Sequence, residues 1–465
     1  MTEKTVQKMD FKKRNIVIAL MVAMFLGAVE GTVVTTAMPT IARDLNGFEL
    51  ISWIFSLYLL TSAISTPIYG KLADLYGRKN MLSLGIFIFL VGSSLCGISG
   101  NMLQLMVFRC VQGLGAGAIL TITYTIVGDI FTLSERAKVQ GWISSVWGIS
   151  SLIGPFLGGF LIDTLSWHWI FFINLPFGIL SIILIQRYLD ESFKKKKHPI
   201  DYAGAFTLSA AIIALLYSFV STGENKGSFM ISMAISLSAA FILFVIFYII
   251  ESKAEEPIIP FDTFTKTNAL INTVSFLLSA VLMGFDVYLP IYIQTVLGYG
   301  PTISGLCLAP MSISWLLSSV ILGDVIPKYG AKKVITVSGI VVLLSCILLL
   351  TLNAESSLIA IIVYSFFSGF GFGGALATLT IVIQSSVGYE KRGAVTASNS
   401  LLRTIGQTIG VSIYGGLLNF NMQYSSSAMP GIHIVFISFV ILSAVSLLTS
   451  VMLLTYPKTQ ILPHN

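Results

Sequence analysis

Long apolar stretches separated by short loops fill almost the whole chain of 465 residues. A helix needs about 20 apolar residues to cross the roughly 30 Å hydrocarbon core of a bilayer. Hydrophobic residues make up 55% of the sequence and charged residues only 10%, whereas soluble domains carry about 25% charged residues. The pattern excludes a soluble protein and predicts an all-α integral membrane protein with 14 transmembrane (TM) helices. The expected spans are 15–42, 51–72, 81–98, 102–131, 139–161, 170–188, 202–220, 228–250, 268–296, 302–323, 334–352, 358–387, 395–418 and 432–454.

The basic residues indicate which loops face the cytoplasm. If the N-terminus is placed inside and the spans alternate, most of the 27 Lys and Arg residues fall in inside loops, as the positive-inside rule requires. Removing one span would exchange the sides of all later loops. We therefore expect both termini to be cytoplasmic, in a multi-pass protein of a bacterial plasma membrane. The net charge of +6 is explained by these loops and does not indicate a nucleic-acid partner.

Several classes of function are disfavoured by what the sequence lacks. The four cysteines, Cys96, Cys110, Cys307 and Cys346, each lie inside an apolar stretch without a C-x-x-C partner, which argues against a disulfide framework or a zinc site. The sequence contains no G-x-x-x-x-G-K-[ST] phosphate loop, the motif of an ATP-driven pump. No loop is long enough for a soluble domain. We therefore expect a protein that is not an enzyme and that uses neither a metal nor a cofactor.

An internal repeat divides the chain into related halves. Residues 70–79 read GKLADLYGRK and residues 323–333 read GDVIPKYGAKK, so both follow a glycine with a Tyr-Gly turn and a basic pair. Two related six-helix halves are typical of a transporter whose binding site lies between them. The expected domains are an N-terminal six-helix bundle over 1–188, a linker over 189–267 with two inserted helices at 202–220 and 228–250, and a C-terminal six-helix bundle over 268–465.

The motifs in the first half resemble those of the major facilitator superfamily. Residues 70–79 match its loop motif G-x-x-x-D-x-x-G-R-[RK], residues 109–117 (RCVQGLGAG) are similar to its R-x-x-Q-G-x-G motif, and residues 29–39 (VEGTVVTTAMP) resemble its first-helix motif. With 14 spans, the chain resembles the drug:proton antiporters of that superfamily. The residues that carry the resemblance are Glu30; Gly70, Asp74, Gly77 and Arg78; Arg109 and Gln112; and, in the antiporter motif, Gly141, Ser150, Gly154, Pro155, Gly158 and Gly159.

Two of these residues depart from the family pattern. Glu30 stands where the family usually has Asp, and Ser150 stands where it usually has Gly. The first change keeps the acid on a longer side chain, and the second replaces one small residue with another.

Charged residues inside the spans are candidate functional residues, because each is costly to bury in a membrane. An ionised Glu30 costs about 2.5 kcal/mol or more on insertion scales, so we expect it to face a cavity or be protonated, as the group that takes up and releases the coupled proton. The alternative is a carboxylate paired with a buried Arg for structure. Asp286 is the second acid, which serves a cationic substrate or caps a break at Pro290. Arg109 needs an acid, a carbonyl or water beside it. Arg403 plays the same role in the second half or binds carbonyls.

The resemblance implies two further groups of residues with conformational roles. Asp74, Arg78 and Asp129 are implied to form a cytoplasmic cluster that latches the halves in the outward-open state. The antiporter motif on the fifth span is implied to form a pliable contact between helices that limits leak. Small residues at its spacing also allow ordinary close packing.

Taken together, the sequence predicts a proton-coupled multidrug efflux antiporter that exports lipophilic or cationic compounds by alternating access. The expected partners are small-molecule drugs or dyes, protons and membrane lipids, and the expected state is a monomer. The alternatives are a superfamily transporter of a single metabolite, such as a sugar, siderophore or amino acid, and a non-transporting sensor or scaffold. Only a transporter requires buried acids in two related halves.

Overall fold

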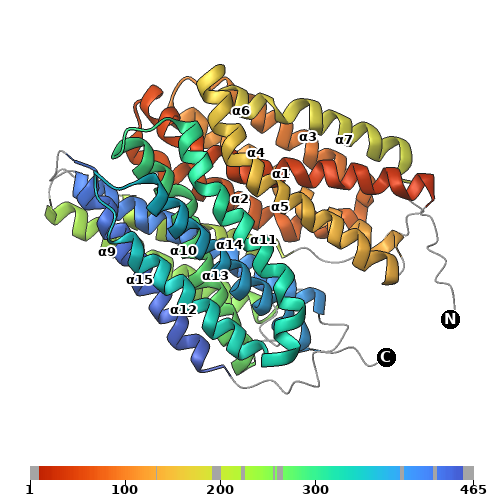
Figure 1. The fold of residues 1–465 in the computed structure, drawn as a ribbon. Helices are drawn as coiled ribbons and strands as arrows, with labels where there is room; N and C mark the ends of the chain where they lie inside the picture. Colours follow the sequence, from red (N-terminus) through yellow and green to blue (C-terminus); the bar gives the residue numbers. More distant parts are fainter. Residues whose placement is uncertain are drawn as a thin grey trace.

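The computed structural model describes residues 10–131, 133–190, 201–220, 226–254, 257–258, 265–387, 392–422 and 427–453, and within the helices it leaves a few side chains, including that of Asp74, undescribed. The described residues form helices and short connections, drawn in Figure 1. In the first half the helices are α1 (Phe11–Asp44), η1 (Phe48–Leu50), α2 (Ile51–Tyr76), α3 (Arg78–Gly97), α4 (Met102–Ile130), α5 (Leu133–Thr164), α6 (Trp169–Phe172) and α7 (Asn174–Tyr188).

The remaining helices lie between residues 202 and 451. They are α8 (Tyr202–Val220), α9 (Lys226–Glu251), α10 (Lys266–Thr295), α11 (Pro301–Tyr329), α12 (Ala331–Leu349), α13 (Leu358–Ser385), α14 (Arg392–Met422) and α15 (Met429–Val451). In Figure 1 the red-to-yellow helices α1–α7 pack together, and the teal and blue helices α10–α15 pack together beside them.

Two glycines end helices at equivalent places in the two halves. Gly77 separates α2 from α3 with φ 92° and ψ 142°, and Gly330 separates α11 from α12 with φ 85° and ψ 147°. Residues with a Cβ avoid this region of backbone space. The sequence repeat therefore corresponds to a repeated helix–glycine–helix turn.

Glycine runs on α4 and α13 allow close helix packing in each half. A Cβ on Gly113 or Gly117 would lie 2.5 Å from a carbonyl oxygen of α2. In the second half, a Cβ on Gly373 would lie 2.9 Å from the carbonyl oxygen of Trp315 on α11. Helices that pack without a Cβ between them approach more closely than others. The glycines therefore allow α4 to pack closely on α2 and α13 to pack closely on α11.

The inserted helices form a hairpin beside the two halves. Leu208 and Ile212 of α8 lie in one apolar cluster with Leu60 of α2 and with Leu401 and Ile405 of α14. On α9 many large apolar side chains are exposed, as expected of a helix that faces lipid. Part of the linker expected over 189–267, including 191–200 and 259–264, lies outside the described residues.

The expected count of 14 spans is not confirmed. In the described part of the chain, 12 helices are long and apolar enough to cross a membrane. The other two expected spans are helices as well. The described apolar part of α8 is short, Tyr202–Leu215, and α14 carries Asn399, Arg403 and Gln407 among its apolar residues.

Several helix ends differ from the expected spans. The first helix begins at Phe11 and includes three basic residues in its first turn, and α5 begins at Leu133 rather than at 139, since helices continue past the hydrocarbon core. The expected span 170–188 is divided at Ile173 into α6 and α7.

Candidate functional site

Glu30 forms a buried ion pair with Arg109 inside the first half. Each residue is only 1% exposed, and Nη1 of Arg109 donates to Oε1 of Glu30. Glu30 lies on α1 and Arg109 on α4, so the pair joins two helices. Of the alternatives left open by the sequence, the described structure has the carboxylate paired with a buried Arg.

The ion pair belongs to a closed ring of hydrogen bonds. Arg109 Nη1 also donates to Gln112 Oε1 at 2.7 Å, and Gln112 Nε2 donates to Ser93 Oγ at 3.2 Å. On the other side, Asn174 Nδ2 donates to Glu30 Oε2 at 2.7 Å and to Ser93 Oγ at 3.0 Å. These five residues, Glu30, Ser93, Arg109, Gln112 and Asn174, come from α1, α3, α4 and α7, and we call them the Glu30 ring.

Further contacts hold the Glu30 ring in place. The Arg109 guanidinium lies 4.1 Å from the centre of the Tyr58 ring on α2, a distance at which a cation is attracted to the aromatic face. Ser93 Oγ donates to the carbonyl oxygen of Phe171 at 2.8 Å. Nε of Arg109 is buried without a hydrogen-bond partner in the described part of the chain, and such an orphan donor is a natural place for a water molecule.

Asp286 is not brought into this ring. It is partly exposed on α10, and no hydrogen bond or ion pair joins it to another described residue. The helix continues without interruption through Pro290 to Thr295, so the idea that Asp286 caps a helix break there is wrong. Its carboxylate is an unpaired acid in the middle of a long apolar helix.

Arg403 is likewise not paired with an acid among the described residues. It is partly exposed on α14, one turn after Asn399. Asn399 Nδ2 donates to Asn272 Oδ1 at 2.8 Å and to Ser275 Oγ at 3.0 Å, which ties α14 to α10. The second half thus has a buried amide network, whereas the first half has a buried charge pair.

The implied cytoplasmic cluster is brought together in part. Arg78 Nε lies 2.6 Å from Asp129 Oδ2 and joins the start of α3 to the end of α4. Asp74 lies on the last turns of α2, but its side chain is outside the described residues. Gly70 lies on the same helix, where a Cβ would meet the Thr121 methyl group at 3.6 Å.

Two other ion pairs lie at this end of the first half. Lys13 donates to both carboxylate oxygens of Glu135 at 2.9 Å and joins α1 to α5. Lys12 donates to Asp190 just beyond α7, and this hydrogen bond lowers the pKa of the Asp190 carboxyl below its ordinary value. Ion pairs therefore join the start of α1 to the start of α5 and to the residue after α7, and they join the start of α3 to the end of α4.

The antiporter motif packs α5 against α1 of its own half. A Cβ on Gly158 would lie 2.6 Å from Thr36 Oγ1 on α1, and Gly154 faces Thr32 one turn earlier. Ser150 is fully buried, and its carbonyl oxygen accepts from Thr32 Oγ1 at 3.3 Å. Of Gly141 the structure describes only its place on α5.

The same motif packs α5 against α11 of the other half. A Cβ on Gly159 would meet the backbone of Thr302, and one on Gly305 would meet the carbonyl of Pro155. Asp163 accepts hydrogen bonds from the backbone N–H and the hydroxyl of Thr302. The motif therefore lies at a contact between the two halves.

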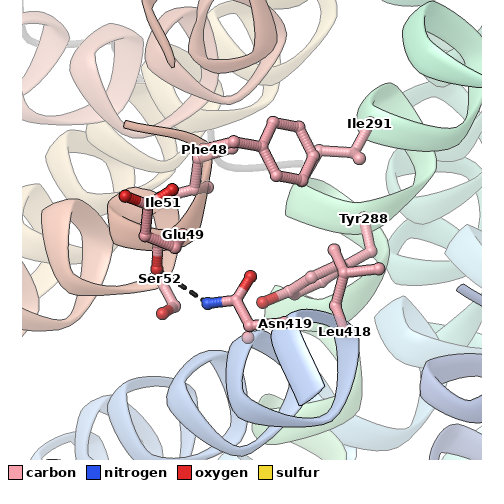
Figure 2. A pocket seen from close by; sticks show the side chains of 9 residues that line it. Phe48, Glu49, Ile51, Ser52, Tyr288, Ile291, Leu418 and Asn419 are labelled. Atoms are coloured by element: carbon pink, nitrogen blue, oxygen red, sulfur yellow. Dashed lines mark hydrogen bonds between the residues drawn. The ribbon is translucent and has the colours of Figure 1, made fainter. Parts of the chain in front are cut away.

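Further hydrogen bonds join the halves at the end where α1 and α10 finish. Gln294 Nε2 on α10 donates to the carbonyl oxygen of Thr36 on α1 at 2.8 Å. Ser56 Oγ on α2 and Ser412 Oγ on α14 are 2.6 Å apart. Asn419 Nδ2 donates to the carbonyl oxygen of Glu49 at 2.8 Å, beside a small pocket shown in Figure 2.

That pocket is too small for an organic substrate. Phe48, Glu49 and Ser52 line it from the first half, and Tyr288 and Leu418 line it from the second. Its volume of about 10 Å³ holds no more than one water molecule. The pocket is a packing gap in the junction between the halves.

Sequence reasoning missed several residues of these contacts. Asn174 and Ser93 complete the Glu30 ring, and the cross-half residues Gln294 and Asp163 were not singled out. Asn174 offered a weak signal, since it is an amide inside an expected apolar span. Among the described residues, no group of three or more His, Cys, Asp or Glu side chains could hold a metal ion.

Comparison with known proteins agrees with the motifs. The sequence profile of the Major Facilitator Superfamily matches residues 20–411. The multidrug transporter protein MdtP of Bacillus subtilis is 36% identical over 88% of this chain and 76% of its own. The multidrug efflux pump SdrM of Staphylococcus aureus is 31% identical over 88% of this chain and 90% of its own. Among solved structures, a D-xylose-proton symporter has a TM-score of 0.67 at 12% identity and covers 96% of this chain and 98% of its own.

Proposed function

Because this chain belongs to the Major Facilitator Superfamily, we propose that it is a proton-coupled multidrug antiporter that exports lipophilic and cationic compounds by alternating access. It is a multi-pass plasma-membrane transporter rather than an enzyme. The relatives named as multidrug transporters, at 31% to 36% identity, support the substrate class. The observation that carries the proton coupling is the buried Glu30–Arg109 pair, and no cofactor is needed if the proton gradient supplies the energy.

The Glu30 ring supplies a chemical reason for coupling. An ionised Glu30 balances the charge of Arg109, which cannot lose its own proton. When Glu30 takes up a proton, this balance is lost and a buried guanidinium is left without a counter-charge, a costly arrangement. Protonation therefore favours a conformation in which Arg109 is solvated or otherwise paired, and release of the proton favours the described one.

The first helix connects this ring to the contacts between the halves. Thr32, two residues after Glu30, donates to the carbonyl of Ser150 on α5. Thr36, one turn further, accepts from Gln294 of the second half. A shift of α1 at Glu30 would therefore disturb the antiporter motif and the junction between the halves. To drive transport, protonation must change the relative stability of two such packings.

We also propose the finer topology of 14 spans with both termini in the cytoplasm. The polar residues of α14 support this, because Asn399 bonds to α10 and Ser412 to Ser56 of α2, and Ser56 also donates to the backbone carbonyl of Thr408. With that topology, the junction described above lies at the outer side. The Arg78–Asp129 pair then lies at the cytoplasmic side, where Asp74 would join it as a latch.

The remaining parts of the proposal concern substrates and assembly. Asp286 is the acid for a cationic substrate, since it is an unpaired intramembrane carboxylate in the described structure and such groups mark transport pathways. Arg403 is a candidate counter-charge in the same half. The antiporter motif limits leak at the contact of α5 with α11. The transporter acts as a monomer surrounded by lipid.

Transport by the purified full chain in liposomes tests the proposal. Vesicles with an imposed pH gradient are loaded with a fluorescent cationic dye, and dye movement is followed with the gradient on and off. We expect gradient-driven transport by the parent and by Glu355→Gln, a control in an exposed loop, and none by Glu30→Gln. Gradient-driven transport by Glu30→Gln at the parent's rate would refute proton coupling at Glu30.

A further inference from the structure

Asn174 is the second donor to the Glu30 carboxylate. Its Nδ2 lies 2.7 Å from Glu30 Oε2, and its side chain is 2% exposed. It stands at the start of α7, directly after the break at Ile173. Asn174 lies outside all the sequence motifs described above. It donates to Oε2 of Glu30, whereas Arg109 donates to Oε1.

An amide is the uncharged side chain that can serve both protonation states of a carboxyl group. The NH₂ of Asn donates to a carboxylate, and its oxygen accepts from a protonated carboxyl. Turning the amide over exchanges the two. A carboxylate accepts only, whereas a protonated carboxyl must donate its one O–H bond.

Ser93 can change from acceptor to donor when the amide turns, in exchange for its hydrogen bond to Phe171. In the described orientation Asn174 donates to Ser93 Oγ at 3.0 Å while Ser93 donates to the carbonyl of Phe171. A hydroxyl rotates freely, so Ser93 can instead donate to the Asn174 oxygen once the amide has turned. Both neighbours of Asn174 would then donate to its oxygen, as both now accept from its nitrogen.

We infer that Asn174 is a positioning residue for the proton step at Glu30. It donates to the ionised Glu30, and in the turned orientation it accepts from the protonated one. The proton arrives from water at Oε2, where an O–H bond forms, and the same bond breaks on release. Asn174 itself neither gains nor loses a proton. This inference rests on the proposed proton coupling. It adds a group that changes its orientation when Glu30 gains or loses the proton.

The other groups around Glu30 have different roles. Arg109 on α4 is permanently charged, Tyr58 on α2 lies against the Arg109 guanidinium, and the Cys96 thiol on α3 lies 3.9 Å from Gln112 Oε1. No charged side chain of α5 or α10 is bonded to Glu30 among the described residues. Two neutral amides of the ring therefore lie beside the carboxylate, Gln112 and Asn174, and Asn174 is the one that donates to Oε2 at 2.7 Å.

Infrared difference spectroscopy of the purified full chain tests the inference at the carboxyl group itself. The band of the protonated Glu30 carboxyl is assigned by its loss in Glu30→Gln and is then titrated with pH. We expect Asn174→Leu to move the midpoint of the titration to higher pH by about one unit, a tenfold change in proton affinity. Both forms of Glu30 lose a partner, but the hydrogen bond to the ionised form is charge-assisted and about twice as strong as the neutral one lost by the protonated form. Asn174→Ala, which adds no bulk, should shift it in the same direction.

Asn399→Leu is the matched control. Asn399 is also 2% exposed and donates to two neighbours at 2.8 and 3.0 Å, but neither neighbour is a carboxylate. We expect it to leave the Glu30 midpoint unchanged even if it lowers stability. The midpoint of Asn174→Gln, which keeps an amide, should lie closer to that of the parent than the midpoint of Asn174→Leu.

The outcomes separate this inference from the proposed function. If Asn174→Leu and Asn174→Ala titrate with the parent's midpoint, Asn174 only supports the fold and the inference is wrong. If the parent shows no gradient-driven dye transport, the proposed function fails, and the infrared titration still decides the role of Asn174 beside Glu30.

Discussion

Removing either partner of the Glu30–Arg109 pair should have unequal effects on stability. Both residues are 1% exposed, so a charge left alone there has little access to water. Glu30→Gln leaves a guanidinium that cannot lose its proton. Breaking a buried pair in this way costs about 3–5 kcal/mol. Arg109→Met leaves a carboxyl group that can bind a proton, and we expect a smaller loss of about 1–3 kcal/mol, the cost of an unsatisfied buried polar group.

The double variant tests the origin of these losses. With Glu30→Gln and Arg109→Met together, no buried charge remains, and replacing a whole ion pair by groups of similar volume is often close to neutral. The double variant should therefore be more stable than Glu30→Gln alone, with a coupling energy of about 2 kcal/mol or more. Transport driven by a pH gradient should nevertheless be absent.

Unfolding of the purified protein in mixed micelles with increasing SDS, followed by circular dichroism, measures these differences. Glu355→Gln in an exposed loop serves as the control for a Glu→Gln change outside the pair. Equal losses for Glu30→Gln and Arg109→Met, added together in the double variant, would show that the two residues act independently. The argument from a buried charge pair would then be wrong.

Three further predictions concern the helix turns and the contacts between elements. Gly330→Ala should cost about 1–3 kcal/mol, because φ is 85° there and a Cβ is strained in that region; an unchanged SDS midpoint would contradict it. Oxidation of Ser56→Cys with Ser412→Cys, whose hydroxyl oxygens are 2.6 Å apart, should stop dye transport until a reductant is added, whereas either single variant should be insensitive to oxidant. Exchanging the charges of Arg78 and Asp129, 2.6 Å apart, should restore part of the transport rate lost by Arg78→Asp alone, and a swap no better than the single variant would argue against a direct pair.

The sequence was most informative where charge interrupts an apolar stretch. Glu30 and Arg109 could be singled out because each is costly in a membrane. The two Tyr-Gly turns indicated the internal repeat, although the expected spans ended at 72 and 323 and the helices continue to Tyr76 and Tyr329. The pairing of Glu30 with Arg109 could not be predicted, since it depends on how α1 packs beside α4. The same limit applies to α14, where Asn399 lowers the apolar character of the helix although it bonds to α10.

Small polar residues make several of the contacts that could not be predicted from the sequence. Ser93 completes the Glu30 ring, and Ser56 joins the two halves, but serines are frequent in membrane helices and mostly bond to their own backbone. Only the packed structure distinguishes those that reach another helix. Asp163 posed a different problem, because an acid near a helix end looks like an ordinary loop residue until Thr302 of the other half is placed beside it.

The hairpin of α8 and α9 adds a third packing unit beside the two halves. Leu208 and Ile212 lie in one apolar cluster with residues of both α2 and α14, so the movement of one half relative to the other that alternating access requires would shift a surface along α8. Those contacts are apolar, and the hydrophobic effect has no preferred direction. Aliphatic side chains can slide past one another without breaking directed bonds. In an alternating-access transporter, the hairpin would therefore stay packed on both halves while they move relative to each other.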